Sequence, residues 1–179
     1  MAHYQDIIDK YYTRQKAKNI LTTHSKLVLD KALLISQRKP ELDIDEDFIV
    51  EACMLHDIGV FLTKSHGIDC FGTYPYICHG YLGRELLEKE NMEKVALVAE
   101  RHTGAGISAF DIVRKNLPLP HRDMMPISIE EKLVCFADKF YSKAGDFLTE
   151  IPLEKIRIKL IKHGEVQLKR FEKLCELFL

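Results

Sequence analysis

The chain has 179 residues, enough for a well-formed core, so we expect a single domain spanning 1–179. Its 26 Lys and Arg residues nearly balance 27 Asp and Glu residues, and the net charge of −1 argues against bulk binding of nucleic acid or anionic membranes. The five cysteines lack CxxC spacing, and no stretch suits a membrane span or a signal peptide, so reduced thiols and a cytoplasmic location are expected.

Apolar residues recur mostly at intervals of three and four, without a sustained alternating run, which predicts an all-α fold. The predicted helices span 4–16, 20–38, 46–57, 76–89, 91–102, 129–144 and 153–178. Asp45 can cap the third helix, and Ser128 with Glu131 forms a capping-box pattern before the sixth. The last helix is expected to cover the core and can kink at Gly164. Its terminal LCELFL leaves room for a homodimer contact.

Two long irregular stretches, 59–75 and 103–127, are rich in glycine and proline. Loops of this length in a compact domain usually serve a site, although either stretch can contain a short helix. We therefore expect them to determine substrate specificity.

Histidines fall on or beside the apolar stripes of four predicted helices, and the sixth helix carries an aspartate in register with its own stripe. The residues are His24, His56, His79, His102 and Asp138. Alone, an inward histidine is more often a core residue, and an inward aspartate can cap a helix or pair with arginine. Together they favour a metal centre, because imidazole and carboxylate groups are transition-metal ligands and a buried carboxylate is costly unless it is paired.

His56 and Asp57 are adjacent at the end of an apolar run. Neighbouring side chains on an α-helix point about 100° apart, so the two can share a metal only where the helix begins to unwind, and Gly59 suits such an end. Because a carboxylate has two oxygens, Asp57 can also bridge two metal ions. The pair would then connect the two ions of a binuclear centre.

These residues resemble the signature H…HD…D of the HD superfamily of metal-dependent phosphohydrolases, over roughly residues 20–145. HDIG, from His56 to Gly59, is the tetrapeptide that names one large subgroup. The resemblance implies a helical bundle with a metal centre in its core. It assigns to the first ion His24, His56, Asp57 and Asp138, and to the second ion His79, His102 and the other oxygen of Asp57.

Two branches of that superfamily need to be weighed. The cyclic-dinucleotide branch carries a double histidine and a GYP tripeptide, whereas Arg101 precedes His102 here and RHTGAGIS contains no GYP, so we do not assign a cyclic dinucleotide substrate. Another branch uses the same six ligands to hold mixed-valent di-iron, which activates oxygen and cleaves C–C or C–P bonds of polyols or phosphonates. The ligands do not separate that branch from the hydrolases.

Two divalent ions against two carboxylates leave a positive site that prefers an anion. The expected activity is hydrolysis of a phosphate ester, from a nucleotide or a small phosphorylated metabolite, by a metal-bound water. The expected metals, two per chain, are Fe, Mn, Zn, Ni or Mg. A mixed-valent di-iron oxygenase is the first alternative and a non-catalytic, metal-stabilised binding module the second.

The residues expected to act in catalysis are Asp57, Lys139 and Arg122. Weaker candidates for holding or protonating the substrate are Lys64, His66, Arg101, Lys143 and Asp123. Tyr76, in TYPY, can stack on a base or sugar, although an aromatic residue beside proline more often packs under a loop.

Overall fold

The computed structural model describes residues 4–179, and its fold is all-α. The first half contains α1 Tyr4–Tyr11, α2 Gln15–Arg38, α3 Glu46–Leu55 and the 3₁₀ helices η1 Pro40–Leu42, η2 Ile58–Leu62, η3 His66–Ile68 and η4 Tyr76–Cys78. The second half contains α4 His79–Lys89, α5 Glu93–Arg101, α6 Ala109–Arg114, α7 Ile129–Asp138, α8 Leu153–Lys162 and α9 Glu165–Phe178. Two two-residue strands, β1 Lys64–Ser65 and β2 Cys70–Phe71, pair antiparallel within 59–75.

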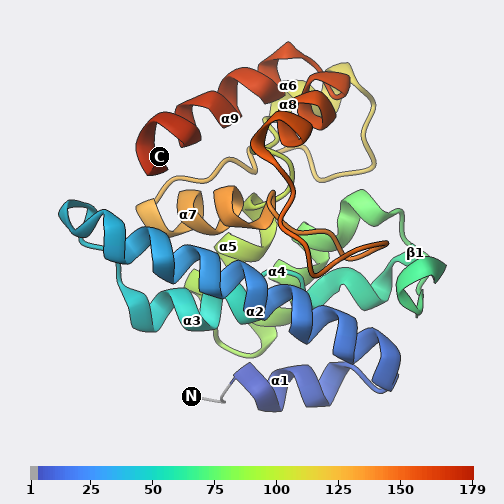
Figure 1. Ribbon diagram of the computed structural model, residues 1–179. Coiled ribbons are helices and arrows are strands. Elements are labelled where there is room, and N and C mark those ends of the chain that lie inside the picture. The colour runs from blue at the N-terminus through green and yellow to red at the C-terminus, as the bar shows by residue number, and fades with distance from the viewer. Residues whose placement is uncertain (1–3) are drawn as a thin grey trace.

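The helices form a central group with helices on two opposite sides (Figure 1). The long α2 runs across the molecule together with α3, α4, α5 and α7, while α1 lies on one side and α6, α8 and α9 lie on the other. One apolar core joins α2, α3, α7, α8 and α9 around Phe136, and a second joins α1, α2, α3 and α5 around Leu55. Both cores contain residues of α2 and α3, so these two helices join them.

Several predicted boundaries were wrong, and the causes are local. The predicted helix 129–144 ends at Asp138, and the predicted helix 4–16 ends at Tyr11. The predicted helix 153–178 is two helices, because Gly164 has φ of 117°, which an α-helix cannot contain. The predicted cap at Asp45 is confirmed, since its carboxylate accepts a hydrogen bond from the Phe48 amide.

The capping-box pattern before α7 is only half present. Ser128 accepts from the Glu131 amide, but Glu131 reaches the Ile127 amide instead of completing the box. A complete capping box lies in 103–127, where Ser108 and Asp111 begin the short helix α6.

The LCELFL segment lies mostly inside the protein. Leu174, Cys175 and Phe178 are buried in the first core, whereas Leu179 is exposed. The feature that suggested a homodimer is thus explained by packing, and the homodimer stays a prediction. All five cysteines are buried and free, and within residues 4–179 no helix has the length and apolarity needed to cross a membrane.

Candidate metal centre

Six side chains from five helices converge in the central group. His24 projects from the middle of α2, His56 and Asp57 follow the last residue of α3, and His79 begins α4. His102 follows α5, and Asp138 is the last residue of α7. All six are buried, with exposed fractions of 8% or less. Their donor atoms form two groups, one of His24, His56, Asp57 and Asp138 and one of Asp57, His79 and His102.

Asp57 belongs to both groups because its two oxygens face opposite ways. Its Oδ2 lies 3.3 Å from His24 Nε2 and 3.1 Å from His56 Nε2. Its Oδ1 lies 3.4 Å from His79 Nε2 and 3.4 Å from His102 Nε2. Each oxygen thus faces a different pair of imidazoles, the arrangement that bridging by Asp57 would need.

Asp138 completes the first group. Its Oδ1 lies 3.0 Å from His24 Nε2 and 3.5 Å from His56 Nε2. The first group therefore offers two imidazole nitrogens and two carboxylate oxygens, a donor set suited to a divalent transition metal.

Gly59 has a different role from the one expected. The chain leaves the α-helix already at Leu55, and Gly59 lies inside η2 without a positive φ. A Cβ atom there would lie 2.3 Å from the His79 carbonyl oxygen and 2.5 Å from the Gly83 nitrogen. Gly59 is thus required for close packing of η2 against α4, which brings Asp57 and His79 together.

Backbone carbonyl groups orient three of the imidazoles. The Nδ1 atoms of His56, His79 and His102 lie 2.6, 2.6 and 2.8 Å from the carbonyl oxygens of Cys53, Tyr76 and Ala99. Since a carbonyl can only accept, each Nδ1 carries a proton, so Nε2 is the ring nitrogen that faces the centre, and it presents a lone pair there when the ring is neutral.

A cation fits this arrangement better than the protein groups fit one another. His79 Nε2 and His102 Nε2 lie 3.0 Å apart, so two lone pairs face each other in a buried space. Asp57 Oδ1 is also buried without a hydrogen-bond partner among the described residues. Buried polar atoms of this kind are costly unless an ion satisfies them.

Burial and neighbouring charges shift the titration of the cluster. Burial disfavours the charged form of Asp57, but Lys143 and His56 outweigh it and hold the pKa of this carboxyl well below its usual value. Burial lowers the pKa of His79 to about 3 and also lowers the pKa of His102. Burial acts likewise on His56, but the two aspartates outweigh it and raise the pKa of His56 to about 9.

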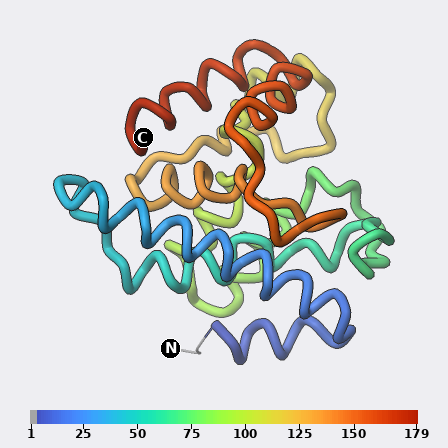
Figure 2. Tube along the Cα trace, in the orientation of Figure 1, coloured from blue at the N-terminus to red at the C-terminus, as the bar shows by residue number. Residues whose placement is uncertain are grey.

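A small cavity of about 210 Å³ opens beside Asp138. It is lined mostly by the segment that follows α7, namely Lys139, Tyr141, Ser142 and Lys143, together with Tyr76, Ile151 and Lys159. Figure 2 shows this segment, in orange, turning away from α7 and crossing the middle of the molecule before α8 begins. Three lysine side chains therefore line the cavity that borders the centre at Asp138, the entrance by which a ligand would reach it.

Lys139 lies where the sequence placed it. Its Nζ is 2.6 Å from Asp138 Oδ2 and 3.2 Å from the His102 carbonyl oxygen. Lys143, one of the weaker candidates, is closer to the bridging carboxylate, with its Nζ 2.6 Å from Asp57 Oδ2. Lys159, on α8, was not a candidate, because only the folding of α8 over this segment brings it to the cavity.

Among the described residues, Arg122 makes its ion pair away from the cluster. Its guanidinium pairs with Glu100, a buried carboxylate that also receives Arg84 at 2.6 Å. This pairing fastens the 118–126 segment to α5 and α4. The catalytic role expected for Arg122 stays a prediction, and none of these contacts supports it.

Three of the other candidates make their contacts elsewhere. Arg101 pairs with Glu131 at 2.8 Å, the His66 ring stacks on Phe71, and Asp123 accepts from the Ala109 amide. Lys64 is exposed on β1.

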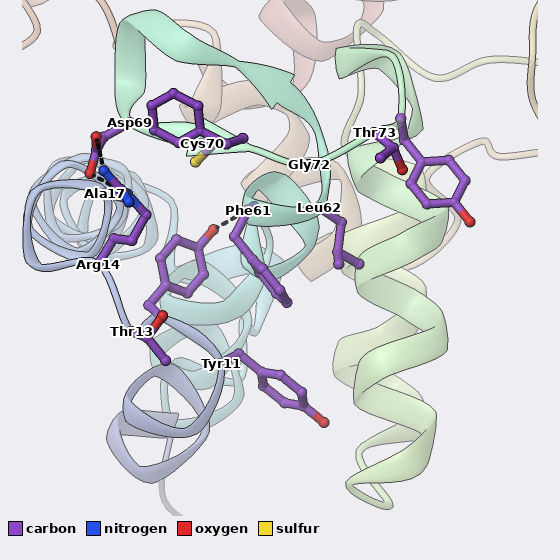
Figure 3. A pocket seen from close by; sticks show the side chains of 13 residues that line it. Tyr11, Thr13, Arg14, Ala17, Phe61, Leu62, Asp69, Cys70, Gly72 and Thr73 are labelled. Atoms are coloured by element: carbon purple, nitrogen blue, oxygen red, sulfur yellow. Dashed lines mark hydrogen bonds and ion pairs between the residues drawn. The ribbon is translucent and has the colours of Figure 1, made fainter.

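A second cavity of about 290 Å³ lies between the α1–α2 turn and the 61–74 segment (Figure 3). Aromatic rings line much of it, and the Arg14–Asp69 ion pair lies at one side. Tyr12 connects it to the metal centre, because its hydroxyl accepts from the Phe61 amide and donates to the Asp57 carbonyl oxygen at 3.4 Å. Much of 59–75 therefore lines this cavity, and Tyr12 in its wall holds the Asp57 backbone in place.

The helical group with a shared aspartate between two sets of histidines defines a metal-binding helical domain. Residues 21–142 match the model of the HD domain family, and the chain belongs to that family. Its buried histidines and aspartates are a ligand set for divalent metal.

Three curated relatives show how this domain occurs elsewhere. An uncharacterized protein of Methanocaldococcus jannaschii is 36% identical over 69% of this chain and 72% of its own length. The tRNA (cytidine(56)-2'-O)-methyltransferases of Picrophilus torridus and Thermoplasma volcanium are 29% and 31% identical over 87% and 79% of this chain. The matched region is only 41% and 36% of those two proteins. No solved structure matches the chain.

Proposed function

We propose that this protein is a metal-dependent phosphohydrolase that uses two divalent ions to cleave a phosphate ester of a nucleotide or small phosphorylated metabolite. The observation that carries the proposal is Asp57, whose two oxygens each face two imidazole nitrogens. Divalent ions held there would activate water and stabilise charge on phosphoryl oxygens.

The chain's own residues supply the remaining requirements. Asp57 and Asp138 would hold the cations, and backbone carbonyls already orient three of the four histidine rings toward them. Lys139 and Lys143 supply positive charge at the entrance, where an anionic substrate must approach. Tyr76, whose ring centroid lies 4.7 Å from that of His79, borders the same entrance and can contact the organic part of the substrate.

The same six ligands also suit a di-iron oxygenase acting on a polyol or phosphonate. The lysine-lined entrance favours an anionic substrate, which supports hydrolysis of a phosphate ester over oxidation of a neutral polyol. A non-catalytic binding module is the third reading, and it does not need a cavity leading to the ligands.

The test is metal analysis of protein purified without oxygen, followed by a screen of phosphate esters with Mn, Fe, Co or Mg. We expect phosphate release by the wild type and none by Asp57→Ala. The screen includes tRNA, because two relatives are named as tRNA methyltransferases. A mixed-valent iron signal in electron paramagnetic resonance, with oxygen uptake and no phosphate release, would replace the hydrolase by the oxygenase.

A further inference from the structure

Lys143 contacts the oxygens that the first metal group needs. Its Nζ lies 2.6 Å from Asp57 Oδ2 and 3.8 Å from Asp138 Oδ1. The same two oxygens face His24 Nε2, at 3.3 and 3.0 Å. A divalent cation bound by this group and the Lys143 ammonium therefore share two oxygens, and their like charges repel at short range.

Lys139 carries the same charge in a different position. It contacts Asp138 through Oδ2, at 2.6 Å, whereas the histidines face Oδ1 of that carboxylate. Its second contact is the His102 carbonyl oxygen, outside the ligand set. Lys139 can therefore keep its contacts when the first metal group is filled, and it is a matched control for the effect of charge alone.

Without a metal, the formal charges of the two carboxylates and the two lysines balance. Asp57 and Asp138 are offset by Lys139 and Lys143, so two divalent ions bring the site to about +4 before substrate binds. An ammonium displaced from Asp57 stays beside two further lysines, and Asp138, the carboxylate that lines the same cavity, is needed by the metal and by Lys139, so a substrate anion is the acceptor left for it. A phosphate monoester dianion compensates more of this charge than a diester monoanion does.

We propose that Lys143 competes with the first metal ion for its carboxylate ligands. Once the metal displaces it, Lys143 binds the substrate. Its ammonium holds Asp57 and Asp138 until a divalent cation takes their oxygens, and it then binds the phosphate of a monoester substrate. The second half of this role rests on the proposed function, whereas the competition does not. The cavity of about 210 Å³ lies below the roughly 300 Å³ at which drug-sized ligand pockets begin, which favours a small monoester.

The experiment measures Mn²⁺ binding by calorimetry to wild type, Lys143→Met and Lys139→Met. We expect Lys143→Met to bind Mn²⁺ about tenfold more tightly, and Lys139→Met to change the dissociation constant by less than about threefold. Inorganic phosphate is then titrated into the Mn²⁺-loaded proteins, and Lys143→Met should bind it about tenfold more weakly than wild type.

Loss of Lys143 leaves two buried carboxylates with one fewer counter-charge, so Lys143→Gln is measured alongside, and circular dichroism checks that each variant is folded. Unchanged or weaker Mn²⁺ binding by both Lys143 variants overturns the competition, whatever the wild type hydrolyses. Equal gains in Mn²⁺ affinity in Lys143→Met and Lys139→Met would mean that any loss of positive charge has the same effect, and this also overturns the competition. Unchanged phosphate binding overturns the substrate role. A wild type that binds Mn²⁺ but neither binds phosphate nor releases it contradicts the proposed function itself.

Discussion

At the scale of single residues, Asp57 is the group on which both metal sites depend. Each of its oxygens faces a different pair of imidazoles, so no other single side chain in the described cluster serves both groups. Its backbone is held as well, because the Tyr12 hydroxyl donates to the Asp57 carbonyl oxygen.

Asp57→Asn should therefore lose both metal ions, whereas His79→Gln should lose mainly the second. The amide keeps the size of the side chain but removes the negative charge and one acceptor oxygen, while the glutamine leaves the first group complete. Metal content measured by plasma mass spectrometry after dialysis distinguishes the two variants. Two ions retained by Asp57→Asn would show that the groups bind metal independently of the bridge.

At the scale of helices and loops, the sequence predicted the ligands better than their surroundings. Periodicity placed His24, His79 and His102 on inward faces, because a stripe of apolar neighbours fixes the direction of a helical side chain. Lys143 was harder to place. It was expected near the end of a helix, but α7 ends at Asp138, and the path beyond depends on contacts such as the Ile151 amide to the Phe140 carbonyl.

Arg122 shows the same limit in a different way. Its partner Glu100 lies on α5, and a bridge between residues so far apart in sequence follows from the packed structure, not from local pattern. The sequence suggested a catalytic role for Arg122 and gave no sign that Glu100 would be its partner. Burial of Glu100, which is 1% exposed, is what makes the pair structurally important.

The packing of η2 against α4 is testable at Gly59. Gly59→Ala places a Cβ atom 2.3 Å from a backbone oxygen and should destabilise the fold by about 1–3 kcal/mol, with weaker binding of the second metal because His79 moves. Gly67→Ala is the control, since nothing lies within 4 Å of its added Cβ. Urea unfolding of both variants gives the comparison, and equal stabilities would contradict the packing role of Gly59.

At the scale of the whole molecule, the metal centre joins helices from both apolar cores. Ligands come from α2, α3, α4, α5 and α7, so their protonation is coupled to folding of the entire domain. Folding lowers the pKa of some of these histidines and raises the pKa of another, so the stability of the metal-free protein should fall on both sides of one pH.

His79 and His102 have folded-state pKa values below the usual 6.5, so their contribution to stability is present above pH 6.5 and is lost as the pH falls below it. His56 has a folded-state pKa of about 9, so its contribution is present below pH 6.5 and is lost as the pH rises toward 9. The three together predict maximal stability of the chelator-treated protein near pH 6.5, with each proton contributing a slope of up to about 1.4 kcal/mol per pH unit.

Urea unfolding in the presence of a chelator at pH 5.5, 6.5 and 8.5 measures this dependence. The slope on the acidic side should be the steeper, because two histidines act there and one acts on the alkaline side. His56→Gln should flatten the alkaline side while leaving the acidic slope in place, since it removes the only one of the three histidines whose pKa is raised. Saturating Mn²⁺ should flatten the alkaline side in the wild type too, because a metal-bound His56 carries no proton to lose. A stability that keeps rising from pH 6.5 to 8.5 without metal would contradict a protonated His56 between the two aspartates.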